Sequence, residues 1–188
     1  MEEKKEWIFL GIVMFIGLLI LINTVHFEGG SGHIKITVTQ QKGAISDIDT
    51  PRKVSSKKTF HVRNINFPQK RMLEHKDLGQ MGYSTNFFID ATTKMSVASE
   101  GNYHFHVRSD DGFRLKIDGK MICEYRGHRP MTTNSCKVHL SKKEHKFSLA
   151  YWQGGGPLGL NVKYQKVGMS KKYFVGDDSK DITFKELK

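Results

Sequence analysis

The sequence lacks the motifs that mark the common enzyme classes. It has no Gly-x-Ser-x-Gly turn, no phosphate-binding loop and no His-Glu-x-x-His pair on a helix. The adjacent carboxylates Asp110 and Asp111 make a poor glycosidase pair, because hydrolysis needs carboxyl groups on opposite sides of the scissile bond. The only two cysteines, Cys123 and Cys136, are interpreted as structural. We therefore expect a protein that is not an enzyme.

Acidic residues are scarce. The chain has 19 Asp and Glu against 30 Lys and Arg, which gives a net charge of +11. A basic balance is compatible with nucleic acid, anionic lipid or an acidic polysaccharide as partner, and equally with lysines that only keep the protein soluble. The net charge alone does not choose among these partners.

Charged side chains are absent from one N-terminal segment. Trp7–Val25 is overwhelmingly apolar, and at about 1.5 Å per residue a helix of this length spans roughly the 30 Å core of a bilayer. A cleaved signal peptide is the alternative, but no A-x-A-like cleavage site follows the run. We predict a cytoplasmic tail at 1–6, a transmembrane signal anchor at 7–27, a flexible glycine-serine linker at 28–33 and one domain at 34–188.

The cysteines bear on which side of the membrane this domain lies. The charges that flank the apolar run barely discriminate between the two orientations. Cys123 and Cys136 are close in sequence and can join as a disulfide, which implies an oxidising compartment; two unrelated buried thiols are the alternative. We expect a single-pass protein of the inner or plasma membrane with its C-terminal domain extracytoplasmic, in the periplasm or outside the cell. A nucleic-acid partner is then not expected.

Convincing soluble amphipathic helices are also absent, and the alternation of side chains indicates strands instead. In "YHFHVR" (103–108), "FRLKID" (113–118), "KFSLAYW" (146–152) and "LGLNVKY" (158–164) every second residue is apolar. Period-two alternation with one apolar face is typical of antiparallel sheets packed on a core. The pattern predicts an all-β, antiparallel, two-sheet sandwich or barrel.

Turn residues agree with this prediction. Asp118-Gly119 separates two alternating runs and suits a type I′ hairpin. The polar stretch from Gln40 to Lys58 is expected to be the longest loop, and a turn or two of helix is expected around residue 75.

Two stretches resemble a known family. "EGNYHFHVRSDDGFRLKIDGKMI" (100–122) and "HKFSLAYWQGGGPLGLNVKY" (145–164) resemble the central signature and a later strand pair of the protective-antigen-type β-barrel domain, the "PA fourteen" domain family. The resemblance is strongest over residues 95–166. It implies a two-sheet β-barrel whose loops often recognise carbohydrate.

The resemblance also implies a site. In lectin-like members, two consecutive aspartates hold a calcium ion that grips sugar hydroxyls, and Asp110 and Asp111 match them here. Calcium prefers six to eight oxygen ligands, so Gln153 could add an amide oxygen, and Gly112 eases the sharp bend. In the alternative interpretation, an aspartate only caps a turn by accepting backbone N–H groups. The candidate ligand-binding residues around this site are Tyr125 and Trp152 for stacking on a sugar, the loop glycines Gly154, Gly155 and Gly156, and Arg126 and His128 for an anionic polymer such as lipopolysaccharide or peptidoglycan.

Two functions remain. The first is a membrane-tethered binding module that recognises a glycan or another envelope polymer with the help of calcium. The second is a structural or docking subunit of an envelope-spanning assembly, which would bind other membrane proteins or copies of itself.

His104 and His106 share a strand face at a spacing that suits a metal, but no third ligand is evident, and solvent-facing histidines are the preferred interpretation.

Overall fold

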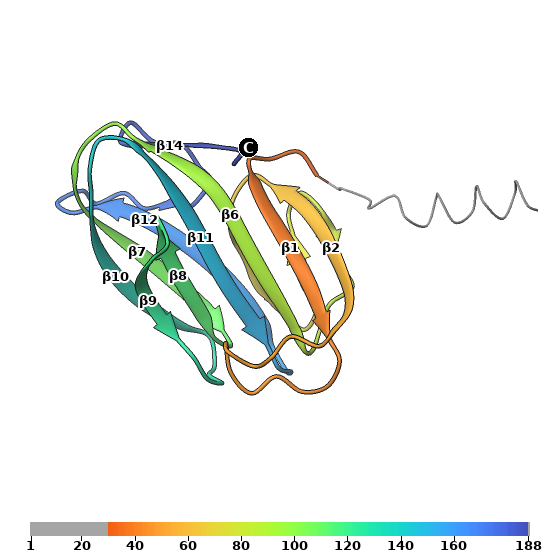
Figure 1. Cartoon of the computed structure of the whole chain (residues 1–188). Coiled ribbons are helices and arrows are strands. Elements are labelled where there is room, and N and C mark those ends of the chain that lie inside the picture. The colour runs from red at the N-terminus through yellow and green to blue at the C-terminus, as the bar shows by residue number, and fades with distance from the viewer. Residues whose placement is uncertain (1–29, 188) are drawn as a thin grey trace, which may run out of the picture.

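The computed structural model describes residues 30–187, and their regular structure is entirely β. Two antiparallel sheets face each other as a sandwich (Figure 1). The predicted fold class is therefore confirmed for this part of the chain. The predicted transmembrane anchor at 7–27 lies outside the described residues, and between residues 30 and 187 no helix is long and apolar enough to cross a membrane.

The first sheet has the strand order β2-β1-β6-β11-β8-β9, with β14 paired to the end of β6. Its strands are β1 (Ile34–Gln41), β2 (Val54–Val62), β6 (Phe87–Val97), β8 (Phe113–Ile117), β9 (Lys120–Tyr125), β11 (Glu144–Gln153) and β14 (Ile182–Lys185).

The second sheet has the order β10-β7-β12-β13, with β3 also paired to β12. Its strands are β3 (Asn66–Lys70), β7 (Gly101–Asp110), β10 (Thr132–Leu140), β12 (Leu158–Lys166) and β13 (Tyr173–Phe174). A small hairpin, β4 (Glu74–His75) and β5 (Gly79–Gln80), stands apart from both sheets.

The core lies between the sheets and follows the alternation in the sequence. The apolar residues of β7, β8, β11 and β12 are buried, while their polar neighbours point outward. A second, smaller cluster lies on the outer side of the first sheet, where Phe88 and Trp152 pack under Ile45 and Ile48 of the loop 42–53. This loop therefore covers part of the first sheet.

Several local predictions can be compared with the structure. Asp118 and Gly119 have φ values of 52° and 78°, as a type I′ hairpin requires. The predicted loop from Gln40 to Lys58 is too long, because β1 continues to Gln41 and β2 begins at Val54. Its last part, residues 54–58, instead belongs to an exposed edge strand, where lysines are well tolerated. The prediction of helical turns near residue 75 is wrong, because this segment forms the β4–β5 hairpin.

The predicted disulfide is confirmed. Cys123 and Cys136 are bonded, with their Cα atoms 6.0 Å apart. Cys123 belongs to β9 at the edge of the first sheet, and Cys136 belongs to β10 at the edge of the second. The bond therefore joins the two sheets along one open side of the sandwich.

Both ends of the domain meet at one end of the sandwich. The Thr93 hydroxyl lies 3.0 Å from the carbonyl oxygens of both His33 and Lys185. A Cβ on Gly30 or Gly32 would lie 2.1 Å from backbone atoms of His61 or Val62, so these two glycines allow close packing in the segment predicted as linker. The loops that follow β1, β7 and β11 lie at the opposite end (Figure 1).

Candidate functional site

The adjacent aspartates lie between β7 and β8, at the end of the sandwich far from residue 30 (Figure 1). The peptide bond between Asp110 and Asp111 is cis, and their side chains are buried, with 7% and 4% of their surface exposed. A Cβ on Gly112 would lie 2.3 Å from Nε1 of Trp152 and 2.7 Å from the carbonyl oxygen of Tyr125. The glycine is therefore needed for close packing at this turn.

The Asp111 carboxylate connects two loops. Oδ1 accepts the backbone N–H of Arg129 at 3.1 Å, and Oδ2 accepts that of Gly154 at 2.9 Å. Arg129 belongs to the loop between β9 and β10, and Gly154 to the loop between β11 and β12. Asp111 thus holds both loops beside the turn, and each carboxylate oxygen retains a further lone pair.

Asp110 carries a charge that its surroundings compensate poorly. Burial and the neighbouring Asp111 raise the pKa of Asp110 to about 6, against the lowering influence of Arg129 and of the backbone N–H of Met131. Within residues 30–187, neither carboxylate makes an ion pair with a lysine or arginine. A cation placed between the two carboxylates would relieve this repulsion.

Gln153 stabilises the glycine-rich loop (154–157) through hydrogen bonds. It is fully buried, and its Nε2 donates to the carbonyl oxygens of Gly155 at 2.9 Å and Pro157 at 3.1 Å. Its Oε1 lies 2.8 Å from the Tyr151 hydroxyl, which is also 2.5 Å from the carbonyl oxygen of Asp110. Burial raises the pKa of Tyr151, so this hydroxyl stays a donor. Gln153 as a metal ligand remains a prediction.

The three predicted loop glycines have different surroundings. A Cβ on Gly154 would lie 2.7 Å from Cε1 of His128, so this glycine lets the two loops approach. Gly155 and Gly156 are exposed, and Gly156 has a φ of 81°, which favours glycine. The loop therefore has an open tip beside the aspartate turn.

The predicted stacking role of Trp152 is corrected by its burial. The indole is fully buried in the small cluster under the loop 42–53, and its Nε1 donates to the carbonyl oxygen of Arg126 at 2.8 Å. Its ring presents no face to solvent. Alternation along β11 put Tyr151 inward and Trp152 outward, but the sequence did not show that a distant loop covers Trp152.

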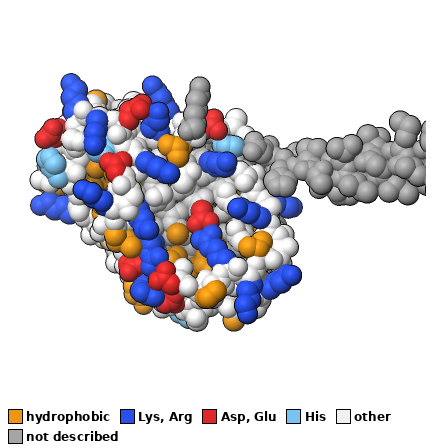
Figure 2. Space-filling view, in the orientation of Figure 1, with side chains coloured by type: hydrophobic (Ala, Val, Ile, Leu, Met, Phe, Trp, Pro, Cys, Tyr) orange, Lys and Arg blue, Asp and Glu red, His pale blue; other side chains and the backbone are white. Residues whose placement is uncertain are grey.

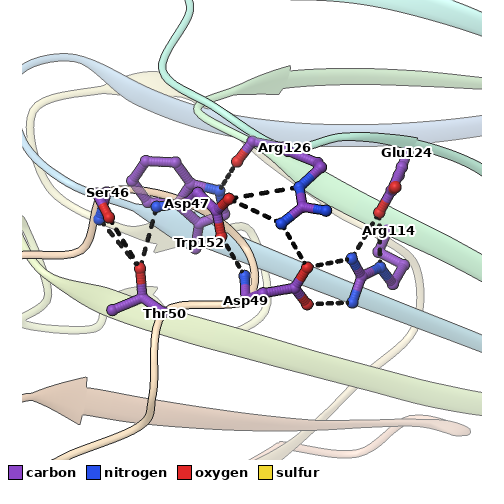
Figure 3. A network of polar contacts seen from close by, with 8 residues as sticks. All are labelled: Ser46, Asp47, Asp49, Thr50, Arg114, Glu124, Arg126 and Trp152. Atoms are coloured by element: carbon purple, nitrogen blue, oxygen red, sulfur yellow. Dashed lines mark hydrogen bonds and ion pairs between the residues drawn. The ribbon is translucent and has the colours of Figure 1, made fainter.

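Arg126 also differs from its predicted role. Its guanidinium pairs with Asp47 at 3.0 Å and Asp49 at 2.8 Å, and Asp49 pairs in turn with Arg114 at 2.6 Å (Figure 3). These contacts hold the loop 42–53 against the sheet. Arg126 is therefore engaged in intramolecular ion pairs rather than turned toward the aspartate turn.

Tyr125 and His128 do lie beside the aspartates. Nδ1 of His128 is 3.3 Å from Oδ1 of Asp111, and its ring stands edge-on to Trp152 with centroids 4.7 Å apart. Tyr125 is 37% exposed and its hydroxyl donates to the His128 carbonyl oxygen at 3.2 Å. The predicted site residues that the structure brings together are thus Asp110, Asp111, Gln153, Gly154, Tyr125 and His128.

Arg129 is central to this arrangement, although it is not among the site residues predicted from the sequence. Its guanidinium lies 4.4 Å from the centre of the Tyr125 ring and donates to Ser109 at 2.6 Å and to Asn134. Burial lowers its pKa. Stacking on an aromatic ring suits a guanidinium, and it fixes the shape of the loop beside Asp111. No spacing in the sequence indicates this packing.

The aspartate turn supplies two of the oxygen ligands that a calcium ion would need. Two adjacent carboxylates with unused lone pairs supply hard oxygen ligands, and among residues 30–187 no lysine or arginine forms an ion pair with either of them. Among the described residues no group of three or more His, Cys, Asp or Glu could hold a metal. Calcium would therefore need amide, carbonyl, water or ligand oxygens in addition to Asp110 and Asp111.

The raised pKa of Asp110 predicts a pH effect on stability. The folded state binds this proton more tightly than the unfolded chain, so Asp110 destabilises the fold above about pH 6 and ceases to do so as the pH falls toward 4. In chelator at pH 7 we expect Asp110→Asn to be more stable than the unchanged protein by about 1–2 kcal/mol. At pH 4 the two should unfold at nearly the same urea concentration. A lower stability of the variant at both pH values would contradict this prediction.

Comparison with known proteins identifies the family. The PA14 domain profile matches residues 76–174, which is more than half of the chain. The chain belongs to the PA14 domain family. The matched range contains both aspartates, the disulfide and the glycine-rich loop, and it confirms the resemblance to the protective-antigen-type domain. No curated protein sequence matches the chain.

Several solved structures, two of them PA14 domains, share the fold at low sequence identity. The PA14 domain of the MpAFP antifreeze protein is 16% identical, with 81% of this chain and 90% of that chain covered and a TM-score of 0.64. The PA14 sugar-binding domain of an RTX adhesin is 18% identical, with coverage of 76% and 96% and a TM-score of 0.58. The A domain of epithelial adhesin 9 from Candida glabrata, in complex with Galβ1-3GlcNAc, is 9% identical, with coverage of 83% and 90% and a TM-score of 0.62.

Proposed function

We propose that this PA14 domain is a carbohydrate-binding module and not an enzyme, with its ligand site at the aspartate turn. The observation that carries the proposal is the buried pair Asp110 and Asp111, which lies between two loops at one end of the sandwich without a lysine or arginine ion pair. Structural neighbours that are sugar-binding or sugar-bound adhesin domains support the same function.

In this proposal Asp110, Asp111 and Gln153 would hold a calcium ion. Bound calcium would supply a Lewis-acidic centre for vicinal sugar hydroxyls. The protein's own residues shape the site: Asp111 fixes both loops through backbone N–H groups, and Arg129 supports the loop that carries His128. The exposed face of Tyr125 and the open tip at Gly155 and Gly156 would then contact the sugar ring.

We also propose that the apolar run at 7–25 tethers the domain to a membrane, with the domain on the extracytoplasmic side. The disulfide fits an oxidising compartment. The exposed large hydrophobic side chains of the described residues are few, namely Val54, Met72, Met121, Tyr125, Val167 and Met169, and they come from four different parts of the chain. This distribution gives less support to the alternative of a protein-docking subunit.

Thermal unfolding with calcium and with chelator tests the site. A ligand at a hundredfold excess over Kd stabilises the folded state by about 2.7 kcal/mol. For a domain of this size, that corresponds to a rise in Tm of about 5–10 °C. We expect this rise in the full chain and its loss in Asp110→Asn, which keeps the side-chain shape. Asp178→Asn, which alters an aspartate near β14, is the control and should respond like the unchanged protein.

A glycan array then tests the function. The full chain, kept in a neutral detergent, should retain a defined set of glycans in calcium, and both chelator and Asp110→Asn should abolish this binding. Galβ1-3GlcNAc is a suitable first probe, since it is the ligand named for one structural neighbour. Glycan binding that survives both chelator and Asp110→Asn would overturn the aspartate site. A calcium effect on Tm with no glycan bound would overturn the carbohydrate function and leave the metal site.

A further inference from the structure

A groove of about 250 Å³ runs across the outer face of the second sheet, and none of the residues that line it belongs to the aspartate site. Its walls come from β3, β7, β10, β12 and β13, which lie far apart in the sequence. Four of its side chains are basic or imidazole groups, namely His106, Arg108, Lys163 and Lys172. The glycan proposal above does not use this groove.

The strand register explains why these side chains meet. His106 of β7 pairs across the sheet with Lys163 of β12, and Arg108 pairs with Asn161 of β12 and with Thr133 of β10. Residues two apart on a strand share a face. The alternation that buries one face of β7 and β12 therefore collects the polar side chains on the other.

Positive charge is concentrated in the groove and is not neutralised there. No acidic side chain lines it, and among the described residues Arg108, Lys163 and Lys172 make no ion pair. Burial, followed by the neighbouring Lys172, His104 and Lys163, lowers the pKa of His106, which shows how closely like charges are placed.

The first sheet offers a contrast. Its outer-face arginines are paired, Arg52 with Asp90 and Arg114 with Asp49. Figure 2 likewise shows basic and acidic side chains interspersed on the face that it views. Arg52 and Arg114 on the first sheet's side are therefore paired with carboxylates, whereas Arg108 in the groove is not.

Neutral groups between these cations suit a sugar. Thr133 exposes its hydroxyl, and Asn161 donates to Asn66 at 2.6 Å, which leaves its own carbonyl oxygen to accept. Phe174 adds an aromatic ring, with Nζ of Lys163 4.6 Å from the ring centre. A concave surface that mixes cations, hydrogen-bonding groups and one aromatic ring matches an anionic saccharide better than a flat lipid surface.

We propose that this groove is a second binding site, specific for saccharides that carry carboxylate or sulfate groups. Arg108 and Lys163 bind the anionic groups, and Thr133 and Asn161 bind neighbouring hydroxyls. The site acts independently of calcium and of Asp110. A glycan with both neutral and acidic sugars would therefore be held at two separate places on one domain.

Binding of the full chain to immobilised polysaccharides tests the proposal. Dextran sulfate and polygalacturonate supply sulfate and carboxylate, and neutral dextran is the control polymer. All measurements are made in chelator, with Asp110→Asn measured beside the unchanged protein. The double variant Arg108→Gln/Lys163→Gln should weaken binding to at least one anionic polymer about tenfold or more. The matched control Lys57→Gln/Lys58→Gln removes the same charge from the exposed strand β2 and should change binding less than about twofold.

Thr133→Val separates a saccharide site from general attraction between charges. This variant keeps the charge and shape, and we expect binding to the preferred anionic polysaccharide to fall several-fold. Phosphatidylglycerol vesicles and single-stranded DNA are measured in parallel. Equal losses in the two double variants would overturn the proposal. Tight binding of vesicles or DNA with the same dependence on Arg108 and Lys163, and no effect of Thr133→Val, would show a general polyanion surface instead.

Discussion

Replacing Trp152 by alanine is expected to lower the free energy of unfolding by about 3–5 kcal/mol, the range for removal of a buried aromatic side chain. The indole is fully buried and anchors Ile45 and Ile48 of the loop 42–53. The ion pairs of Arg126 that hold the same loop are exposed, and such pairs contribute about 0–1 kcal/mol. The apolar contact therefore dominates, and urea unfolding of the variant measures its loss.

A second variant separates the ring from its N–H group. Trp152→Phe keeps an aromatic ring but cannot donate to the carbonyl oxygen of Arg126, a hydrogen bond that typically contributes about 1 kcal/mol. We expect it to be clearly more stable than the alanine variant and less stable than the unchanged protein. If Trp152→Ala kept full stability and lost only glycan binding, the indole would be a ligand contact after all, and its assignment to the small core cluster would be wrong.

Breaking the disulfide should have the second-largest effect. Cys123 and Cys136 are 13 residues apart, and a closed loop of about this length constrains the unfolded chain by about 3 kcal/mol. For a domain of this size the expected fall in Tm is about 6–12 °C. Differential scanning calorimetry of the Cys123→Ala/Cys136→Ala variant measures it.

The position of the disulfide predicts which residues lose protection from amide exchange when it is removed. It joins the edge strands β9 and β10, and the loop between them carries His128 and Arg129. Amide exchange should therefore quicken first in residues 120–140, while β1 and β6 stay protected. The unchanged protein in reductant is the control and should match the variant. A Tm that stays the same in both would show that the edges are held by packing alone.

The sequence predicted the fold well because the core depends on local alternation. The runs at 103–108, 113–118 and 158–164 each indicate one buried face, and the structure buries those faces. The Asp118-Gly119 turn is equally local, since its backbone angles suit few other residues. The prediction failed where a strand has no buried face of its own. Such a strand is β2, whose polar, lysine-containing sequence resembles that of a loop.

The site could be predicted only in part, since it depends on contacts between distant segments. Asp110 and Asp111 were found because they match the two consecutive aspartates of the protective-antigen-type domain, and the glycine-rich loop because it matches a loop of the same family. The burial of Trp152 depends on a loop about 100 residues earlier, and the role of Arg129 depends on Tyr125, Ser109 and Asn134. Neither arrangement leaves a pattern of spacing that a single sequence displays.

The meeting of both chain ends at one end of the sandwich has a practical consequence. Thr93 lies within hydrogen-bonding distance of His33 and Lys185, while the aspartate turn lies at the far end (Figure 1). A protein attached to either end of the domain would then lie at the opposite end from the aspartate turn and would leave the loops beside that turn uncovered. A fluorescent protein fused after Lys185 would make a labelled probe that reports where the ligand of this domain is displayed.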